Sequence, residues 1–160
     1  MFDLPLDATY AWLGVALVSV VTAGVAATLP ASPPPDANGA AHTIDSVADG
    51  AYPATAEHGL AADRILLTTG TVSLSDGDGT ARATLHAPRI TPVPSTSATV
   101  DGRLVRVLAG VPPDDVFDDP ASFAAAAESA RAANHEWHAA PERLTIRQVQ
   151  YGDARVTLVG

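Results

Sequence analysis

The sequence predicts an α+β protein in which an N-terminal transmembrane helix precedes a small domain with an antiparallel sheet and one main helix. Three observations predict this architecture. Residues 8–29 carry no charge, several later stretches alternate apolar and polar residues, and one later segment has a well-marked helix start. The sequence has no alternation of strands with long helices, which favours an antiparallel sheet over a parallel one.

The uncharged segment is long enough to cross a membrane. Its 22 residues would reach roughly 33 Å as a helix, and a bilayer's hydrocarbon core is about 30 Å thick. Tyr10 and Trp12 lie near its start, where aromatic rings favour the headgroup region. We therefore expect a single-pass membrane protein with these two residues at the membrane interface.

One face of this predicted helix carries small side chains. Ser19, Ala23 and Ala27 recur every four residues, a spacing that lets two membrane helices approach closely. An alanine-rich composition alone would also produce such a stripe. The three residues are the candidate helix–helix interface.

The residues on either side of the uncharged segment indicate whether it is a membrane anchor or a cleaved signal peptide. A cleaved signal peptide normally starts with basic residues, whereas residues 1–7 contain Asp3, Asp7 and no base. The prolines in residues 30–39 predict an extended stalk. The chain then divides into a tail (1–7), a transmembrane helix (8–29), the stalk and an α+β domain (40–160). An uncleaved anchor followed by such a stalk favours an extracellular domain on the cell membrane, although the positive-inside rule gives no guidance, because the first basic residue is Arg64, 35 residues after Leu29.

Composition excludes several functions. The nine basic residues are all arginine, they face 14 Asp and 4 Glu, and the net charge is −9. A chain this acidic lacks the basic surface that binds nucleic acid. It has no cysteine, so disulfides and thiolate metal sites are excluded. The acid-rich, lysine-free composition predicts adaptation to high salt, where short screening lengths make charge repulsion tolerable. An ordinary acidic protein encoded by a GC-rich genome is the alternative.

The domain reads as short strands with two helices, of which the second is the main one. The expected elements before residue 110 are a short helix near 40–49 with Ile44 and Val47 on one face, strands at 64–68 and 71–74 around Gly70, a turn at 76–79, a strand at 81–86, a loop or edge segment at 88–94, and a strand at 103–108.

The main helix has the clearest start. Asp119 can cap it, and Pro120 suits the first helical position. Its expected buried residues are Phe123, Ala126, Ala127 and Ala130, and Asn134 is a plausible end. The C-terminus predicts a hairpin of strands 144–151 and 154–159 joined by Gly152-Asp153, with a type II′ turn.

No cluster of reactive side chains matches a known catalytic pattern. His135 and His138 lie three apart, but the His-Glu-x-x-His spacing of zinc proteases is absent. Residues 76–79 resemble a fragment of a calcium loop and more simply form a turn. The acid run of Asp114, Asp115, Asp118 and Asp119 suits a solvated helix start. We therefore expect no catalytic, cofactor-binding or metal-binding residue.

Motifs along the whole chain resemble a haloarchaeal family of uncharacterised single-pass membrane proteins. They are Phe2–Asp7, Trp12–Gly14, Leu29-Pro30 with Pro33–Ala37, Arg103–Leu108, Pro112–Phe117 and Thr157–Gly160. Members of that family are often encoded near archaeal type IV pilus or type II secretion-like genes. The resemblance implies an accessory role in the cell envelope and supplies no catalytic residue.

These observations predict a non-enzymatic, membrane-anchored accessory protein of a pilus or secretion assembly, minor-pilin-like or an assembly factor. Its expected partners are the membrane and a membrane protein of that assembly, with no cofactor and no nucleic acid. A membrane-tethered sensor or ligand-binding module is the alternative, and it would need a pocket with convergent polar groups. A tethered hydrolase or metalloenzyme centred on His135 and His138 is a third hypothesis.

Overall fold

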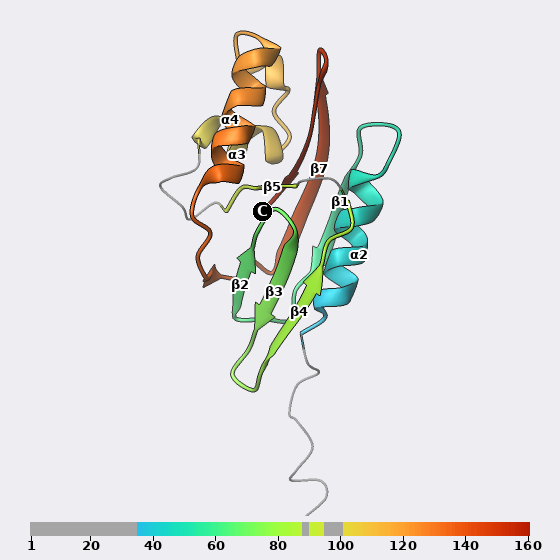
Figure 1. Ribbon diagram of the computed structural model, residues 1–160, viewed down its shortest axis with the longest axis vertical. Coiled ribbons are helices and arrows are strands. Elements are labelled where there is room, and N and C mark those ends of the chain that lie inside the picture. Colours follow the sequence, from blue (N-terminus) through green and yellow to red (C-terminus); the bar gives the residue numbers. More distant parts are fainter. Residues whose placement is uncertain (1–34, 88–89, 95–100) are drawn as a thin grey trace, which may run out of the picture. The chain divides into compact units, whose positions relative to one another are not determined.

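The computed structural model describes residues 35–87, 90–94 and 101–160, whose elements are labelled in Figure 1. The helices are α2 (Ala37–Ala48), α3 (Gly102–Leu108) and α4 (Pro120–Ala132), with a 3₁₀-helix at Pro113–Asp115. The strands are β1 (Thr55–Gly59), β2 (Arg64–Leu67), β3 (Thr71–Ser75), β4 (Thr80–Thr84), β5 (Thr91–Pro92), β6 (His138–Ala139), β7 (Arg143–Tyr151) and β8 (Ala154–Val159). The predicted α+β class is confirmed for this part of the chain.

The predicted membrane segment lies outside the described residues. So do the tail, most of the stalk, the aromatics Tyr10 and Trp12, and the stripe of Ser19, Ala23 and Ala27. Among the helices that the structure describes, none has both the length and the apolar character needed to cross a bilayer.

Helix α2 begins three residues before the predicted position, so the last residues assigned to the stalk are helical. Asp36 is the cause, because its carboxylate accepts a hydrogen bond from the Gly39 amide at 2.8 Å and caps the helix. Ile44 and Val47 are buried as predicted. The helix ends at Ala48, ahead of Tyr52.

The strands form two four-stranded sheets where one antiparallel sheet was predicted. The strand orders are β1-β7-β8-β5 and β4-β3-β2-β6. Every pair is antiparallel except β5 with β8, which run parallel. β5 lies at the edge of its sheet beside β8, so the predicted loop or edge segment at 88–94 contains a short strand at Thr91–Pro92.

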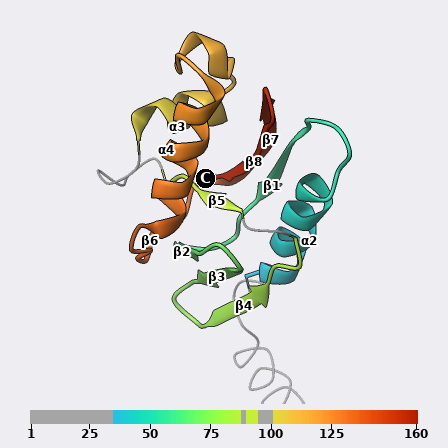
Figure 2. The same ribbon diagram turned by 45° about the horizontal axis from the view of Figure 1, so that its top comes forward.

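Two hydrophobic cores lie on opposite faces of the β7–β8 hairpin. The first core lies between α2, the N-terminal half of β7 and the inner face of the β4-β3-β2-β6 sheet. It includes Ala40, Ile44, Val72, Leu74 and Ile146. The second packs α3 and α4 against the upper half of the hairpin, and it includes Leu104, Phe123, Ala127, Val149 and Val156. Figure 2 shows α2 on one side of β7 and β8 and the other two helices opposite. Because side chains alternate along a strand, β7 serves both cores.

The second helix of the described chain corrects the predicted strand at 103–108. Asp101 accepts a hydrogen bond from the Arg103 amide, which caps α3. Leu104, Val107 and Leu108 are buried, and their spacing of three and four residues is the helical period. Three helices, α2, α3 and α4, therefore contribute to the cores, where the sequence predicted a short first helix and one main helix.

The main helix and the C-terminal hairpin follow the prediction. Asp119 accepts a hydrogen bond from the Ser122 amide, and the four expected residues of α4 are its buried residues. The helix ends at Ala132, two residues before Asn134. Gly152 has φ +56°, and a Cβ there would lie 2.8 Å from Pro120 Cγ, so both the turn and the packing favour glycine.

Candidate interaction surface

The two histidines of the predicted cluster do not share a site. His135 Nε2 lies 3.3 Å from the Arg131 carbonyl, at the end of α4. His138 Nδ1 lies 3.0 Å from the Ala139 carbonyl, in β6. No group of three or more potential metal ligands occurs among the residues that the structure describes.

The acidic clusters have local structural roles. Asp76 Oδ1 accepts hydrogen bonds from the Asp78 and Gly79 amides at 2.9 and 2.8 Å, which closes the β3–β4 turn on itself. Asp119 caps α4, and Asp114 and Asp115 lie in the first turn of the 3₁₀-helix. The predicted turn is thereby confirmed, and the acid run lies at helix starts as expected.

A small cavity lies where β6 and β2 approach the ends of β7 and β8. Its volume is about 210 Å³, below the roughly 300–1,000 Å³ typical of ligand pockets. The lining is mostly apolar and includes Ile65, Leu67, Leu144 and Val159, with His138 as its one imidazole. Such a cavity suits a small apolar group better than a polar substrate.

The outer face of the β4-β3-β2-β6 sheet carries a different set of side chains. Strand alternation sends Ile65, Leu67, Val72, Leu74 and Ala83 into the first core. We call the other side chains of β2, β3 and β4 the outer face. They are Arg64, Leu66, Thr71, Ser73, Ser75, Thr80, Arg82 and Thr84. Register aligns Leu66, Ser73 and Arg82 in one row across β2, β3 and β4. Hydroxyls and two arginines therefore dominate this face.

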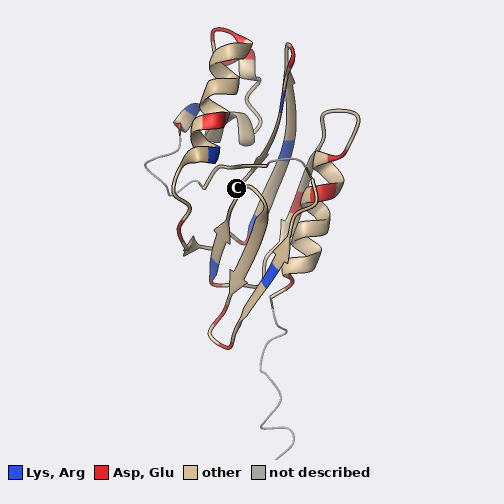
Figure 3. Ribbon diagram, viewed as in Figure 1, with Lys and Arg blue, Asp and Glu red and all other residues tan. Residues whose placement is uncertain are grey.

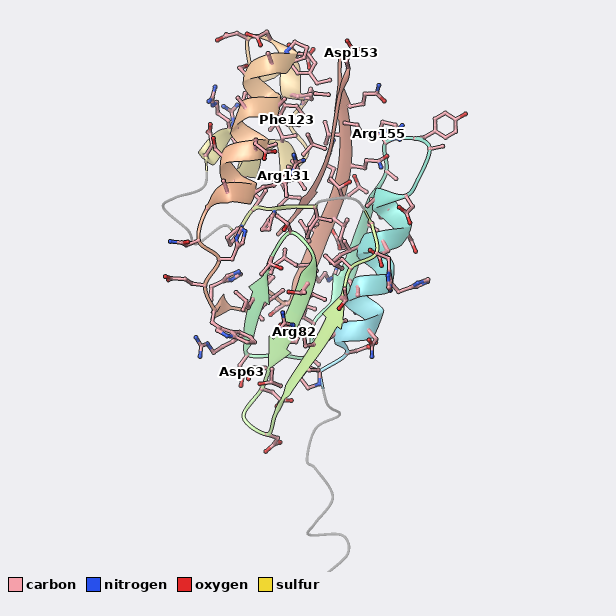
Figure 4. All side chains as sticks on the ribbon, viewed as in Figure 1. Asp63, Arg82, Phe123, Arg131, Asp153 and Arg155 are labelled. Atoms are coloured by element: carbon pink, nitrogen blue, oxygen red, sulfur yellow. The ribbon has the colours of Figure 1, made fainter. Side chains whose placement is uncertain are left out.

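Both arginines of the outer face are exposed. The Arg64 guanidinium lies 5.6 Å from the ring centroid of the half-buried Trp137, a cation–π arrangement. Arg82 forms no ion pair with any residue that the structure describes. Figure 3 shows the two arginines in blue on β2 and β4 and the acids at the turn below, and Figure 4 labels Arg82.

The outer face is an island of positive charge on an acidic chain. Its eight residues include two arginines and no acid, whereas the whole chain has a net charge of −9. Acids lie just beyond it, at Asp63 and in the turn at Asp76 and Asp78. Ser73 at its centre is buried, whereas Arg64, Thr80, Arg82 and Thr84 are exposed, so the two arginines are the part of this face that suits contact with an acidic surface.

This surface was not predicted from the sequence. The strands at 64–68 and 81–86 were expected, and their alternation could have placed Arg64 and Arg82 on the same side. The pairing of β6 with β2, which brings Trp137 beside Arg64, carried no local signal because β6 has only two residues.

A family of unknown function, DUF7283, matches residues 3–149. The chain belongs to this family. The matched range of DUF7283 includes the predicted membrane segment and extends into β7. None of the curated proteins matches the chain, and no solved structure matches it. DUF7283 membership confirms the resemblance to an uncharacterised family.

Proposed function

We propose that the protein is a non-enzymatic, single-pass membrane protein that acts as an accessory subunit of a pilus- or secretion-type envelope assembly. The uncharged residues 8–29 support the membrane anchor. The resemblance to haloarchaeal proteins encoded near pilus and secretion genes supports the assembly. The exposed arginines of the outer face, Arg64 and Arg82, support action through protein contact.

The observation that carries the proposal is how the chain enters the domain. Pro35 is buried, and Ala37 and Ala40 are 2% and 0% exposed. Asp36, which lies between Pro35 and Ala37, caps the first turn of α2. The chain from the N-terminal segment therefore enters the hydrophobic core directly, with no free linker after residue 35. A domain that is packed from residue 35 onward suits a subunit with a defined place in an assembly.

The proposed contact between the anchor and a partner's membrane helix can be tested at the stripe of small residues, Ser19, Ala23 and Ala27. Ala23→Leu places a large side chain on the stripe and should reduce the amount of membrane partner that co-purifies with the full chain in mild detergent. Val25→Leu is the matched control, because residues two apart lie on nearly opposite faces of a helix. Equal co-purification of both variants with the native chain would contradict a helix–helix interface. Recovery of the chain without membranes after lysis would contradict the anchor itself.

A membrane-tethered ligand-binding module is the second candidate, and it would have to use the small apolar cavity. Its apolar lining and its volume of about 210 Å³ fit a small apolar molecule. Thermal denaturation of the full chain with a panel of such molecules tests it. A melting temperature that rises with the logarithm of the ligand concentration would favour this function over the accessory role.

A further inference from the structure

Strand β4 is an edge whose free side can be identified residue by residue. Leu85 N donates to Gly70 O at 2.9 Å, and Asp76 N donates to Gly79 O at 3.1 Å. Hydrogen-bonded pairs alternate in an antiparallel ladder, so the register turns the backbone groups of Ala81 and Ala83 toward β3. The N–H and C=O groups of Thr80, Arg82 and Thr84 consequently point to the free edge.

Within the described part of the chain, this edge is closed at one end and has no paired strand along its length. His86 continues the same alternation, and its amide donates to Asp45 Oδ1 and Oδ2 of α2 at 3.0 and 3.1 Å. No described strand pairs with the free side of β4, and Thr80, Arg82 and Thr84 are all exposed. Three alternate residues, Thr80, Arg82 and Thr84, therefore offer backbone groups to an incoming strand, and Asp45 limits how far that strand extends.

The charge of β4 indicates what kind of strand fits. Its sequence, Thr-Ala-Arg-Ala-Thr, is symmetric about Arg82. Antiparallel pairing with a second copy, centred on this residue, would oppose two arginines, and like charges directly opposite each other are destabilising. An Asp or Glu at that position would instead face Arg82, which has no ionic partner among the described residues.

We propose that the β4 edge binds an extended, acidic segment of a partner protein as an added strand, with a carboxylate opposite Arg82. Backbone hydrogen bonds to Thr80, Arg82 and Thr84 supply the binding, and Arg82 selects for acidic sequences. The inference rests on the proposed function in requiring a protein partner, but it does not depend on which assembly contains that partner.

A synthetic peptide tests the proposal on the full chain in lipid nanodiscs. The probe is acetyl-Ser-Thr-Val-Glu-Val-Thr-Ser-amide carrying a fluorescent label, and anisotropy reports binding. One comparison peptide has Lys in place of Glu. Another is N-methylated at Glu and both Thr, which removes the donors that would pair with the edge. Measurements use the lowest salt concentration at which circular dichroism shows the full fold, because salt screens the charge pair.

The proposal predicts binding of the Glu peptide with a Kd below about 1 mM and binding of the Lys peptide about fivefold weaker. The N-methylated peptide should not bind. Arg82→Glu should invert the preference between the Glu and Lys peptides. Arg106→Glu is the matched control, because Arg106 is an exposed arginine on α3, and it should leave the preference unchanged.

Several results would overturn the proposal. No binding of the Glu peptide would exclude strand addition, and equal binding of the N-methylated peptide would show attraction by charge alone. An unchanged preference in Arg82→Glu would remove the assigned role of this residue. A dimer detected by light scattering that the peptide dissociates would assign the edge to a second copy. None of these results affects co-purification through the Ser19, Ala23 and Ala27 stripe, so the proposed function is tested separately.

Discussion

Asp45 joins two parts of the chain that lie some forty residues apart. Besides its bonds to the His86 amide, its Oδ1 accepts a hydrogen bond from the Ala87 amide at 3.0 Å. The carboxylate thus fixes the chain after β4 to α2. Because two backbone amides would lose their acceptor, this side chain should matter more for stability than a surface aspartate.

Asp45→Ala should lower the free energy of unfolding by about 1.5–3 kcal/mol, the range typical of hydrogen bonds to a charged group. Asp45→Asn should cost less, since its remaining oxygen can still accept from both amides. Asp49→Ala is the control, because Asp49 is exposed at the end of α2. Urea denaturation compares the variants, and similar losses for Asp45→Ala and Asp49→Ala would contradict this role.

Asp101 gives a pH-dependent contribution at the start of α3. Arg103 donates from Nη2 to Asp101 Oδ2 at 2.7 Å, and this hydrogen bond lowers the pKa of the Asp101 carboxyl below its usual 3.8. A pKa that is lower in the folded state stabilises the fold above the unfolded pKa. That contribution is lost as the pH falls through the folded value.

Arg103→Met should therefore raise the Asp101 pKa toward its usual value, while the methionine still covers Phe117. Carboxyl titration by nuclear magnetic resonance measures this shift, and the variant should lose less stability between pH 4 and lower pH values than the native chain. An unchanged Asp101 pKa would show that another group lowers it.

Helix α4 depends on its cap. The Asp119 side chain satisfies the Ser122 amide at 2.8 Å, and replacing such a cap by alanine typically costs about 0.5–2 kcal/mol. Asp119→Ala should lower the melting temperature accordingly, and Asp118→Ala, which removes an exposed neighbour that is not the cap, should have a much smaller effect. Calorimetry of both variants checks the difference, and equal effects would argue that only local charge matters.

Helices with complete local signals were predictable from the sequence. For α4, the cap, the proline and the apolar spacing agree, and the structure matches them. The segment at 103–108 shows the limit, because Val105 and Val107 favour a strand while Leu104, Val107 and Leu108 follow a helical period. This segment forms a helix because Asp101 caps it and because its apolar residues pack with Phe117 and Phe123 in the second core.

Strands with weak patterns were missed. β1 is polar and alternates only between exposed and half-buried residues, so pairing with β7 defines it as a strand. The two-residue strands are likewise defined only by pairing, β5 with β8 and β6 with β2. Because the edge position of β4 follows from all these pairings, the candidate binding edge was not predictable from local sequence.

The charge of the whole molecule predicts its response to salt. A net charge of −9 on 160 residues destabilises the compact state by self-repulsion, and screening shortens to about 3 Å at 1 M salt. The melting temperature of the full chain should therefore rise between dilute buffer and molar sodium chloride. Replacing Asp114, Asp115 and Asp118 by Asn should reduce the salt needed for folding, whereas a melting temperature independent of salt would contradict the halophilic interpretation.

The long β7–β8 hairpin holds the two cores of the described chain together. It carries Leu144 and Ile146 in one core and Val149 and Val156 in the other. The chain enters the domain at Pro35, beside the first core. The free edge of β4 borders the same core. This arrangement places the proposed anchor connection and the proposed binding edge on the same packed unit.

Protease shaving of intact cells, with peptides from residues 35–160 followed by mass spectrometry, tests whether the protein is a membrane-anchored subunit of the cell envelope. Lysed cells supply the control for cleavage. The proposal predicts that domain peptides are released from intact cells while the protein fractionates with membranes. Protection of the domain until lysis, or recovery of the intact protein without membranes, would contradict it.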